Sequence, residues 1–286
     1  MKKFFIVLIS IILICLTVLG VIGCFVEQSE AESNSQVLSG QNEKLSEWKI
    51  LDTATLDINK IEGYKPGGVM VPSKTSKEDE EDLEQENKMV TEVGGLELPF
   101  TPPYRQMEIV SIGGYTGQLL DDTSDNKKEN VLSMIIKNTS DKVIDYGEII
   151  IKIKGQNKGL SFKFSDLKPG AAALVLESSK EVQFSEDDKY VYLDSRAEFV
   201  DEMDMMKEEI NITTEDNKIT VENISDENLN TVYVYYKTVS PGGCYLGGTT
   251  YRAKFVNLTK SKVETIETLH FDKENSEIIK VESVKE

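Results

Sequence analysis

The chain has 286 residues, of which 32 are basic and 50 acidic, so its formal net charge is −18 at pH 7. A strongly acidic chain repels phosphate backbones, and the composition therefore excludes nucleic acid as the expected partner. His270 is the single histidine, which excludes metal sites built from several imidazoles and leaves one imidazole as a candidate general base. The length predicts about two domains.

Residues 1–26 are typical of a membrane-directed segment. Lys2 and Lys3 precede residues 4–26, which carry no charged side chain. At about 1.5 Å per residue, a helix over this run would be about 34 Å long, enough to cross a hydrocarbon core of roughly 30 Å. Because such lysines stay on the cytoplasmic side, we expect the bulk of the chain on the extracytoplasmic side of the cell membrane.

Three fates of this segment stay open from the sequence. It can remain as an uncleaved transmembrane anchor, or be removed as a signal peptide at the small residues Ser29 and Ala31. Residues 21–24, Val-Ile-Gly-Cys, also resemble a bacterial lipobox, in which Cys24 would carry the lipid. Each alternative leaves the rest of the chain outside, attached to or released from the membrane.

Residues 27–95 are expected to form a flexible acidic stalk. Residues 27–44 are rich in Gln, Ser, Glu, Asn and Gly, and residues 77–86 contain seven acids. Such segments bury too little apolar surface to offset the entropy of ordering. The one tryptophan, Trp48, is expected to dock on a neighbouring domain.

Beyond residue 95, short apolar alternations separated by turn residues predict an all-β sandwich fold. The candidate strands are residues 107–112, 131–137, 148–154, 160–164, 171–177 and 190–193. Leu160, Phe162 and Phe164 alternate with polar residues, so these three side chains should share the buried face.

An internal repeat divides this part of the chain into two copies. Residues 136–141 match residues 221–226 at a spacing of 85, and residues 148–152 match 233–237 at the same spacing. Residues 164–167 match 255–258 only if six extra residues are allowed in the second copy. We therefore expect two β-sandwich domains, residues 96–205 and 206–286.

Three segments carry a resemblance to a known family. They are Asn-Thr-Ser-Asp at 138–141, Leu-Lys-Pro-Gly at 167–170 and Tyr-Leu-Gly-Gly-Thr-Thr-Tyr at 245–251. These residues resemble uncharacterised two-domain exported proteins of Gram-positive bacteria, with FxLYD-type and related immunoglobulin-like domains. The resemblance covers residues 95–286 and implies two tandem immunoglobulin-like sandwiches without a known activity, although the Phe-x-Leu-Tyr-Asp motif itself is absent.

The six extra residues fall in a glycine-rich hairpin beside several tyrosines. Tyr233 and Tyr235 share one face of a predicted strand, whereas Val232 and Val234 occupy the other. Either the tyrosines pack across strands in the ordinary way, or this face binds a sugar or peptide. On the second interpretation the ligand-binding residues are Tyr233, Tyr235, Tyr245 and Tyr251.

Two further candidates carry weaker chemistry. Asp121, Asp122 and Asp125 place several carboxylates in one loop, which is suggestive of calcium but lacks the glycine and distal glutamate of an EF-hand. Cys15 and Cys24 lie in the apolar run, so Cys244 has no partner for an intramolecular disulfide in the exported part and is expected to be a buried free thiol.

From these features we expect a membrane-attached extracytoplasmic binding or interaction protein without catalytic activity and without a cofactor. Its partner would be a protein or a glycan. The alternative is an accessory or regulatory subunit of a cell-envelope transporter or sensor complex, whose domains dock on a membrane protein. An enzyme is not expected, because the sequence contains no recognisable catalytic arrangement.

Overall fold

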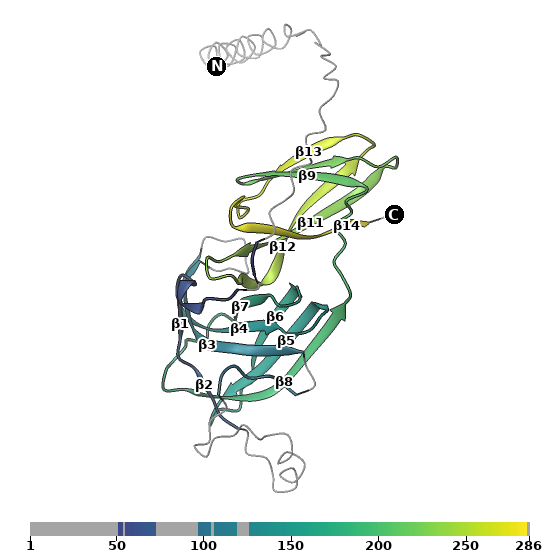
Figure 1. The fold of residues 1–286 in the computed structure, drawn as a ribbon. Helices are drawn as coiled ribbons and strands as arrows, with labels where there is room; N and C mark the ends of the chain where they lie inside the picture. The colour runs from purple at the N-terminus through teal and green to yellow at the C-terminus, as the bar shows by residue number, and fades with distance from the viewer. Residues whose placement is uncertain (1–50, 54, 73–96, 104–105, 119–125, 285–286) are drawn as a thin grey trace, which may run out of the picture. The chain divides into compact units, whose positions relative to one another are not determined.

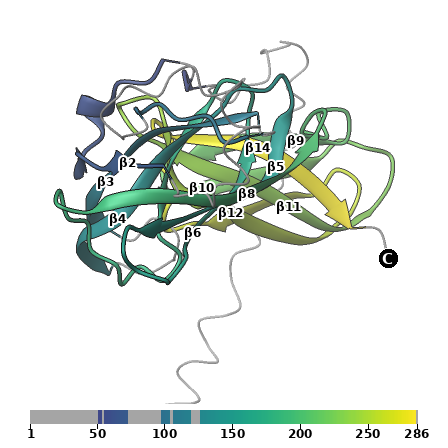
Figure 2. The ribbon, with the colours of Figure 1, turned by 90° about the horizontal axis from the view of Figure 1, so that it is seen from below.

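A computed structural model describes residues 51–53, 55–72, 97–103, 106–118 and 126–284. Apart from the short 3-10 helix η1 (Ile58–Lys60), every regular element in these residues is a β-strand, so the all-β prediction is confirmed. The strands form sheets of seven, four and three members (Figure 1 and Figure 2). Within the described residues, no helix has the length and apolarity needed to span a membrane.

Strands β3 to β8 make up what we call the first group. One of its layers contains β3 (Met107–Gln118), β4 (Lys127–Asn138) and β7 (Ala172–Leu176), and the other contains β5 (Val143–Ile153), β6 (Leu160–Leu167) and β8 (Lys189–Val200). Each of the six predicted strands overlaps one of these. Leu160, Phe162 and Phe164 are buried together in the core that the two layers share, as their alternation predicts.

Strands β9 to β14 make up the second group, with the same neighbour relations. One layer contains β9 (Ile210–Glu215), β10 (Lys218–Asn223) and β13 (Val263–Glu267), and the other contains β11 (Leu229–Val239), β12 (Tyr245–Leu258) and β14 (Ser276–Val284). In one layer the middle strand is the second in chain order, β4 or β10, and in the other layer it is the first in chain order, β5 or β11. A separate apolar core lies between these layers.

Asn138 explains why the repeated Asn-x-Ser sequence recurs. This asparagine is fully buried at the end of β4, and its side-chain amide donates to the carbonyls of Lys142 and Leu167, each at 2.8 Å. Its side-chain oxygen accepts the backbone N–H of Ser140 at 2.9 Å. One side chain therefore ties the end of β4 to the following turn and to the end of β6.

Asn223 repeats this arrangement in the second group. It is also fully buried, and its amide donates to the carbonyls of Glu227 and Leu258, each at 2.8 Å. Asn223 lies 85 residues after Asn138, and Leu258 lies 91 residues after Leu167. The hydrogen bonds thus reproduce the repeat spacing and place the six extra residues between these points of the second group.

The extra residues extend the start of β12 and join the two groups. Tyr245 and Leu246 of β12 pair in parallel with Ala173 and Leu174 of β7, while the rest of β12 pairs with β11. The result is one seven-stranded sheet in the order β1-β3-β4-β7-β12-β11-β14. The hairpin that the sequence suggested as a recognition loop is therefore a structural joint.

The stalk prediction is wrong for part of residues 51–72. β1 (Tyr64–Pro66) pairs antiparallel with β3, and β2 (Val69–Met70) pairs parallel with β8. Ile61 and Tyr64 are buried on the outer face of the β3-β4-β7 layer. The stalk was predicted from the acidic composition averaged over residues 27–95, and this average concealed a short apolar segment. The segment is ordered because it packs against the β3-β4-β7 layer.

Several predictions concern residues outside the described ranges. These are the anchor or signal segment 1–26 with Cys24, the remainder of the stalk with Trp48 and the acidic run 77–86, and the loop with Asp121, Asp122 and Asp125. They stay predictions.

Candidate functional site

Tyr245 does not lie on a surface, and its prediction as a ligand-contacting residue has to be corrected. The side chain is fully buried within the core of the first group. Its hydroxyl donates to Glu277 Oε2 at 2.9 Å, and Glu277 is itself almost completely buried. Burial, together with the charge of Glu277, raises the pKa of the Tyr245 hydroxyl. A ligand at the surface cannot reach this ring, because the hairpin packs it against the first group.

The same joint contains an ion pair across the two groups. Lys168, in the turn between β6 and β7, pairs with Glu277 of β14. Lys237 is also fully buried, and its ammonium lies over the Tyr245 ring and near the carbonyls of Gly248 and Thr249 at 3.3 and 3.4 Å. These buried charges are each provided with polar partners, as buried ions must be. Lys237 and Glu277 are closed to solvent, whereas the Lys168 side chain is 30% exposed.

Cys244 is a buried free thiol, as expected from the sequence. Its sulfur lies 3.3 Å from the Ser240 hydroxyl. Burial raises the pKa of the Cys244 thiol to about 11, so the reactive thiolate is scarce at neutral pH. The backbone at Gly243, next to Cys244, lies so close to Thr55 that only glycine fits there. Gly243 has φ +77°, and a Cβ atom would lie 2.1 Å from the Thr55 carbonyl oxygen.

Tyr233 and Tyr235 lie on the outer face of the β14-β11-β12 layer, while Val232 and Val234 are buried on its inner face. The division of the two faces is confirmed. The tyrosine rings are half-buried and lie 6.3 Å apart between their centroids. This strand therefore presents its aromatic residues outward, as the alternation predicted.

Cations from neighbouring strands cover both rings, which the sequence reasoning did not anticipate. The Arg252 guanidinium lies 5.0 Å from the Tyr233 centroid, and the Lys280 ammonium lies 4.8 Å from the Tyr235 centroid. Arg252 pairs with Tyr235 in the register of β12 and β11, and Lys280 pairs with Tyr235 in that of β14 and β11. The sequence does show the basic residues Arg252 and Lys280, but their position over the tyrosine rings depends on the register between strands.

Lys280 is held firmly in this position. Its ammonium lies 2.9 Å from Asp166 Oδ1 and 3.2 Å from Glu282 Oε1. Burial alone would lower the pKa of Lys280, but the hydrogen bond and charge of Asp166, assisted by Glu282, outweigh it and raise the pKa. The Tyr235 hydroxyl also donates to Glu282 at 2.8 Å. The polar groups around Tyr235 therefore have their hydrogen-bond and charge partners within the protein.

Tyr251 belongs to a stack of aromatic rings at the other side of β12. Its ring is stacked on Tyr236 at 5.5 Å and on His270 at 5.6 Å between centroids. Tyr236 is buried in the second core and meets Phe271 edge-on at 5.2 Å. Both faces of the Tyr251 ring are therefore occupied, and His270 is the outer member of the stack.

Two hollows flank this stack and share Tyr251, Leu269 and His270. The larger has a volume of about 580 Å³ and runs between residues 249–254 of β12 and residues 266–270 at the end of β13. The smaller, of about 370 Å³, lies between the same loop and the β3 residues Tyr115 and Gln118. Both volumes fall within the range of small-ligand sites. We refer to the larger one as the β12–β13 groove.

His270 and Leu269 have features that the sequence reasoning missed. The Nε2 atom of His270 is buried and has no hydrogen-bond partner within the described part of the chain, although a buried polar atom normally has one. Leu269 is 85% exposed at the groove. An exposed leucine therefore lies beside an imidazole nitrogen without a partner, and neither property follows from residue order alone.

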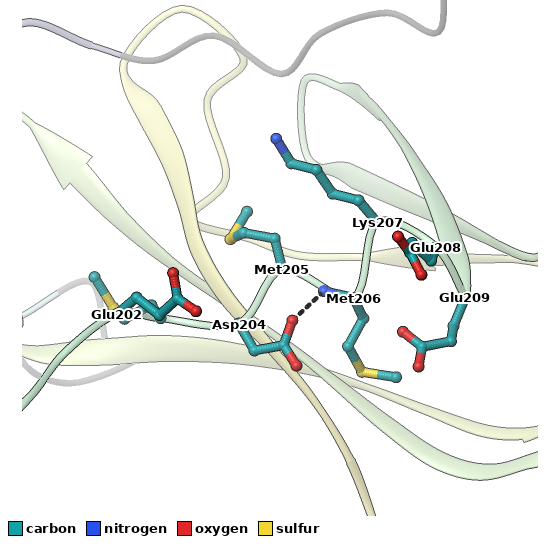
Figure 3. Close-up of a pocket in the computed structure, with 8 residues that line it drawn as sticks. Glu202, Asp204, Met205, Met206, Lys207, Glu208 and Glu209 are labelled. Atoms are coloured by element: carbon teal, nitrogen blue, oxygen red, sulfur yellow. Dashed lines mark hydrogen bonds between the residues drawn. The ribbon is translucent and has the colours of Figure 1, made fainter.

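A third hollow, of about 470 Å³, follows the connecting segment 202–209 between β8 and β9. Figure 3 shows the Asp204 carboxylate accepting the Met206 N–H at 2.8 Å, with the Lys207 side chain pointing away from it. Met203 packs against the first core and Met206 against the second. The acidic lining belongs to one continuous stretch of chain, and we interpret it as a connector between the two groups.

The chain matches no protein-family model and no curated protein. The expected resemblance of residues 95–286 to exported immunoglobulin-like proteins therefore stays a prediction. Among the described residues, no three or more His, Cys, Asp or Glu side chains are gathered so that they could hold a metal ion. The β12–β13 groove is the candidate site that the geometry favours.

Proposed function

We propose that this protein is a membrane-attached extracytoplasmic binding protein built from two tandem immunoglobulin-like domains. The equal strand order of the two groups, their separate cores and the repeated asparagine corner support the tandem domains. The uncharged run 4–26 behind Lys2 and Lys3 supports the membrane attachment and its orientation.

The observation that carries the binding function is the buried, unpartnered His270 Nε2 atom at the end of an aromatic stack beside the β12–β13 groove. A ligand in the groove would cover Leu269, and a small movement of the loop around His270 would bring this nitrogen within reach of a hydrogen-bonding group of the ligand. Apolar and aromatic walls with a few polar groups are the usual composition of a binding site. The loop after β13 contributes Thr268, Leu269 and His270 to the groove, and loops on a β scaffold are where recognition commonly resides.

Binding without chemistry is the proposal because the polar groups of the groove do not form a catalytic arrangement. The His270 ring is stacked on Tyr251 at 5.6 Å, and the other polar lining consists of Thr249, Thr250, Thr268, Glu267 and two cations. Among the described residues, the one cysteine thiol is buried at the joint, away from this lining. A peptide or a glycan fits a groove of this size and composition.

The test is a peptide array and a glycan array probed with the full-length chain and with a Leu269→Ser, His270→Ala variant. We expect the wild type to retain a ligand and the variant to lose it, because the variant removes the exposed apolar contact and the imidazole. Ile224→Ser is the matched control, since Ile224 is also an exposed aliphatic residue of the second group but does not line the groove.

Circular dichroism must show that the variants keep their β-structure. Equal binding by the wild type and the Leu269→Ser, His270→Ala variant would remove the groove as the site. Equal loss in Ile224→Ser would show that the effect is a general one of the second group.

A further inference from the structure

The open edge of β12 determines which ligand class fits the groove. β7 occupies the sheet position next to β12 only at Tyr245 and Leu246. From there to Leu258, the edge of β12 opposite β11 has no paired strand among the described residues. The β12–β13 groove begins at Thr249, directly beyond the point where β7 leaves this position.

The lining of the groove shows that backbone, as well as side chains, is accessible there. Residues 249–254 of β12 line it consecutively. Because neighbouring side chains of a strand point to opposite faces, one face alone would contribute every second residue. A consecutive run indicates that the groove follows the edge of the strand, where N–H and C=O groups are directed.

Two hydrogen bonds identify which backbone groups of β12 point outward. The Val256 carbonyl accepts the Lys262 ammonium at 3.3 Å, so it is directed away from β11. The Val281 N–H donates to the Asp204 carbonyl and therefore not to β11, which leaves its partner Val234 to bond with Ala253 on the β12 side. Both observations assign outward backbone groups to the even-numbered residues Arg252, Lys254 and Val256.

The side chains that line the groove differ in character between its two sides. Arg252 and Lys254 are exposed on the outer face of the layer, and neither has a carboxylate partner within the part of the chain that the structure describes. Ile266, which packs against the second core, and the exposed Leu269 line the groove on the β13 side. The lining also contains one acid, Glu267, on the β13 side. In a chain with a net charge of −18, two cations on one side of the groove against a single acid on the other mark a local preference for negative charge at the Arg252 and Lys254 side.

We propose that the β12–β13 groove binds an extended peptide segment of a partner protein, which adds as a strand to the open edge of β12. The segment would have alternating side chains: acidic ones toward Arg252 and Lys254, and apolar ones toward Ile266 and Leu269. This alternation follows from the two-residue period of a strand. Strand addition to an exposed sheet edge is an established mode of peptide recognition, in which the backbone contributes affinity and alternate pockets contribute specificity.

The joint between the two groups supplies the internal precedent. Tyr245 and Leu246 already bind β7 on this same edge of β12, so the proposed peptide continues a sheet position that β7 occupies for two residues. The proposal rests on the binding function of the groove and specifies its ligand as a peptide.

The experiment uses the full-length chain and short synthetic peptides in which apolar and acidic residues alternate, with peptides of the same composition but clustered acids as controls. We expect the alternating peptides to bind and the clustered ones to bind at least about tenfold more weakly. Methylation of single peptide nitrogens should weaken binding at every second position, since only alternate N–H groups of an added strand face β12. If the loss of binding on methylation does not alternate along the peptide, strand addition is overturned.

A substitution in the protein gives the second test. Lys254→Pro removes one outward N–H and the charge, whereas Lys254→Ala removes the charge alone. Proline is tolerated at an edge where the N–H faces solvent, and circular dichroism checks that the strand persists. We expect Lys254→Pro to weaken binding by at least about tenfold more than Lys254→Ala. Equal effects would overturn strand addition.

The outcomes separate this proposal from the broader one. A glycan that binds the wild type and is lost in the Leu269→Ser, His270→Ala variant, with no peptide bound, overturns strand addition but supports the groove as the site. Binding of neither ligand class overturns both proposals.

Discussion

β7 and β13 occupy the same place in the two strand groups, 91 residues apart, yet their outward side chains are of opposite character. In β7 these are Ala172, Leu174 and Leu176, all buried. In β13 they are Val263, Thr265 and Glu267, all exposed. The same hydrogen-bonded framework is therefore covered on both faces in the first group and on one face in the second.

The cover of the first group comes from two sources. Residues 56–64 pack their apolar side chains on the outer face of the β3-β4-β7 layer, and Cys244 and Leu246 of the hairpin pack beside them. The Asp57 N–H donates to the Gly242 carbonyl at 2.8 Å, which connects these two covering segments. A strand covered on both faces has a continuous apolar sequence, and one covered on a single face alternates; Ala-Ala-Leu-Val-Leu and Val-Glu-Thr-Ile-Glu follow this rule.

The largest expected effect comes from one substitution made at the equivalent position of each group. Leu174→Asp places a carboxylate in a fully buried apolar site, which should cost more than about 4 kcal/mol and unfold the first group. Thr265→Asp, at the equivalent exposed position, should change the free energy of unfolding by less than about 1 kcal/mol. Urea unfolding followed by circular dichroism measures both. Similar losses in the two variants would contradict the difference in cover.

Alternation and repetition in the sequence predict the framework well. The Leu160, Phe162 and Phe164 face, the Val232 and Val234 face and the 85-residue spacing all depend on the local period of a strand or on similarity within the chain. Each was recovered in the structure. Such features need no knowledge of what packs against them.

The predictions that failed concern contacts between segments that are distant in the sequence. Tyr245 looked like an exposed tyrosine in a flexible glycine-rich loop, but β7 and Glu277 enclose it. The Tyr233 and Tyr235 rings are covered by cations whose position depends on strand register. His270 was considered only as a general base, because its stacking on Tyr251 and its unpartnered nitrogen exist only in three dimensions.

The next largest effect should be equal in the two groups. Asn138→Ala and Asn223→Ala each remove a buried amide that donates to two carbonyls and an oxygen that accepts a backbone N–H. Because buried groups left without partners cost about 1–3 kcal/mol each, we expect each variant to lose about 3 kcal/mol of unfolding free energy. Urea unfolding provides the measurement.

Asn211→Ala is the control for both asparagine variants. Asn211 also belongs to an Asn-x-Thr triplet, but its amide makes a longer, partly buried hydrogen bond of 3.3 Å with Glu222. Its replacement should cost less than about 1 kcal/mol. A large loss in one of Asn138→Ala and Asn223→Ala but not in the other would show that the corner stabilises only one group.

The smallest expected effect concerns alkaline pH and the hairpin that only the second group possesses. Burial raises the pKa of the Cys244 thiol from 9.0 to about 11, so the folded protein holds this proton more tightly than the unfolded chain. The contribution to stability is therefore fully present below about pH 9 and is lost as the pH rises through about 11. At about 1.4 kcal/mol per pKa unit, the whole shift corresponds to about 3 kcal/mol, of which about 2 kcal/mol is lost by pH 10.5.

Cys244→Ala isolates this contribution. The variant loses stability at every pH because it leaves a small cavity, but between pH 8 and 10.5 its unfolding free energy should fall less steeply than that of the wild type. Tyr64 and Tyr245 are present in both proteins, and burial raises both of their pKa values. The charge of Cys244 also helps to raise the pKa of Tyr64, so the difference in slope reports the thiol together with its coupling to Tyr64. Parallel curves would mean that the thiol is hydrated in solution, and the hairpin would then not seal the outer face of the first group.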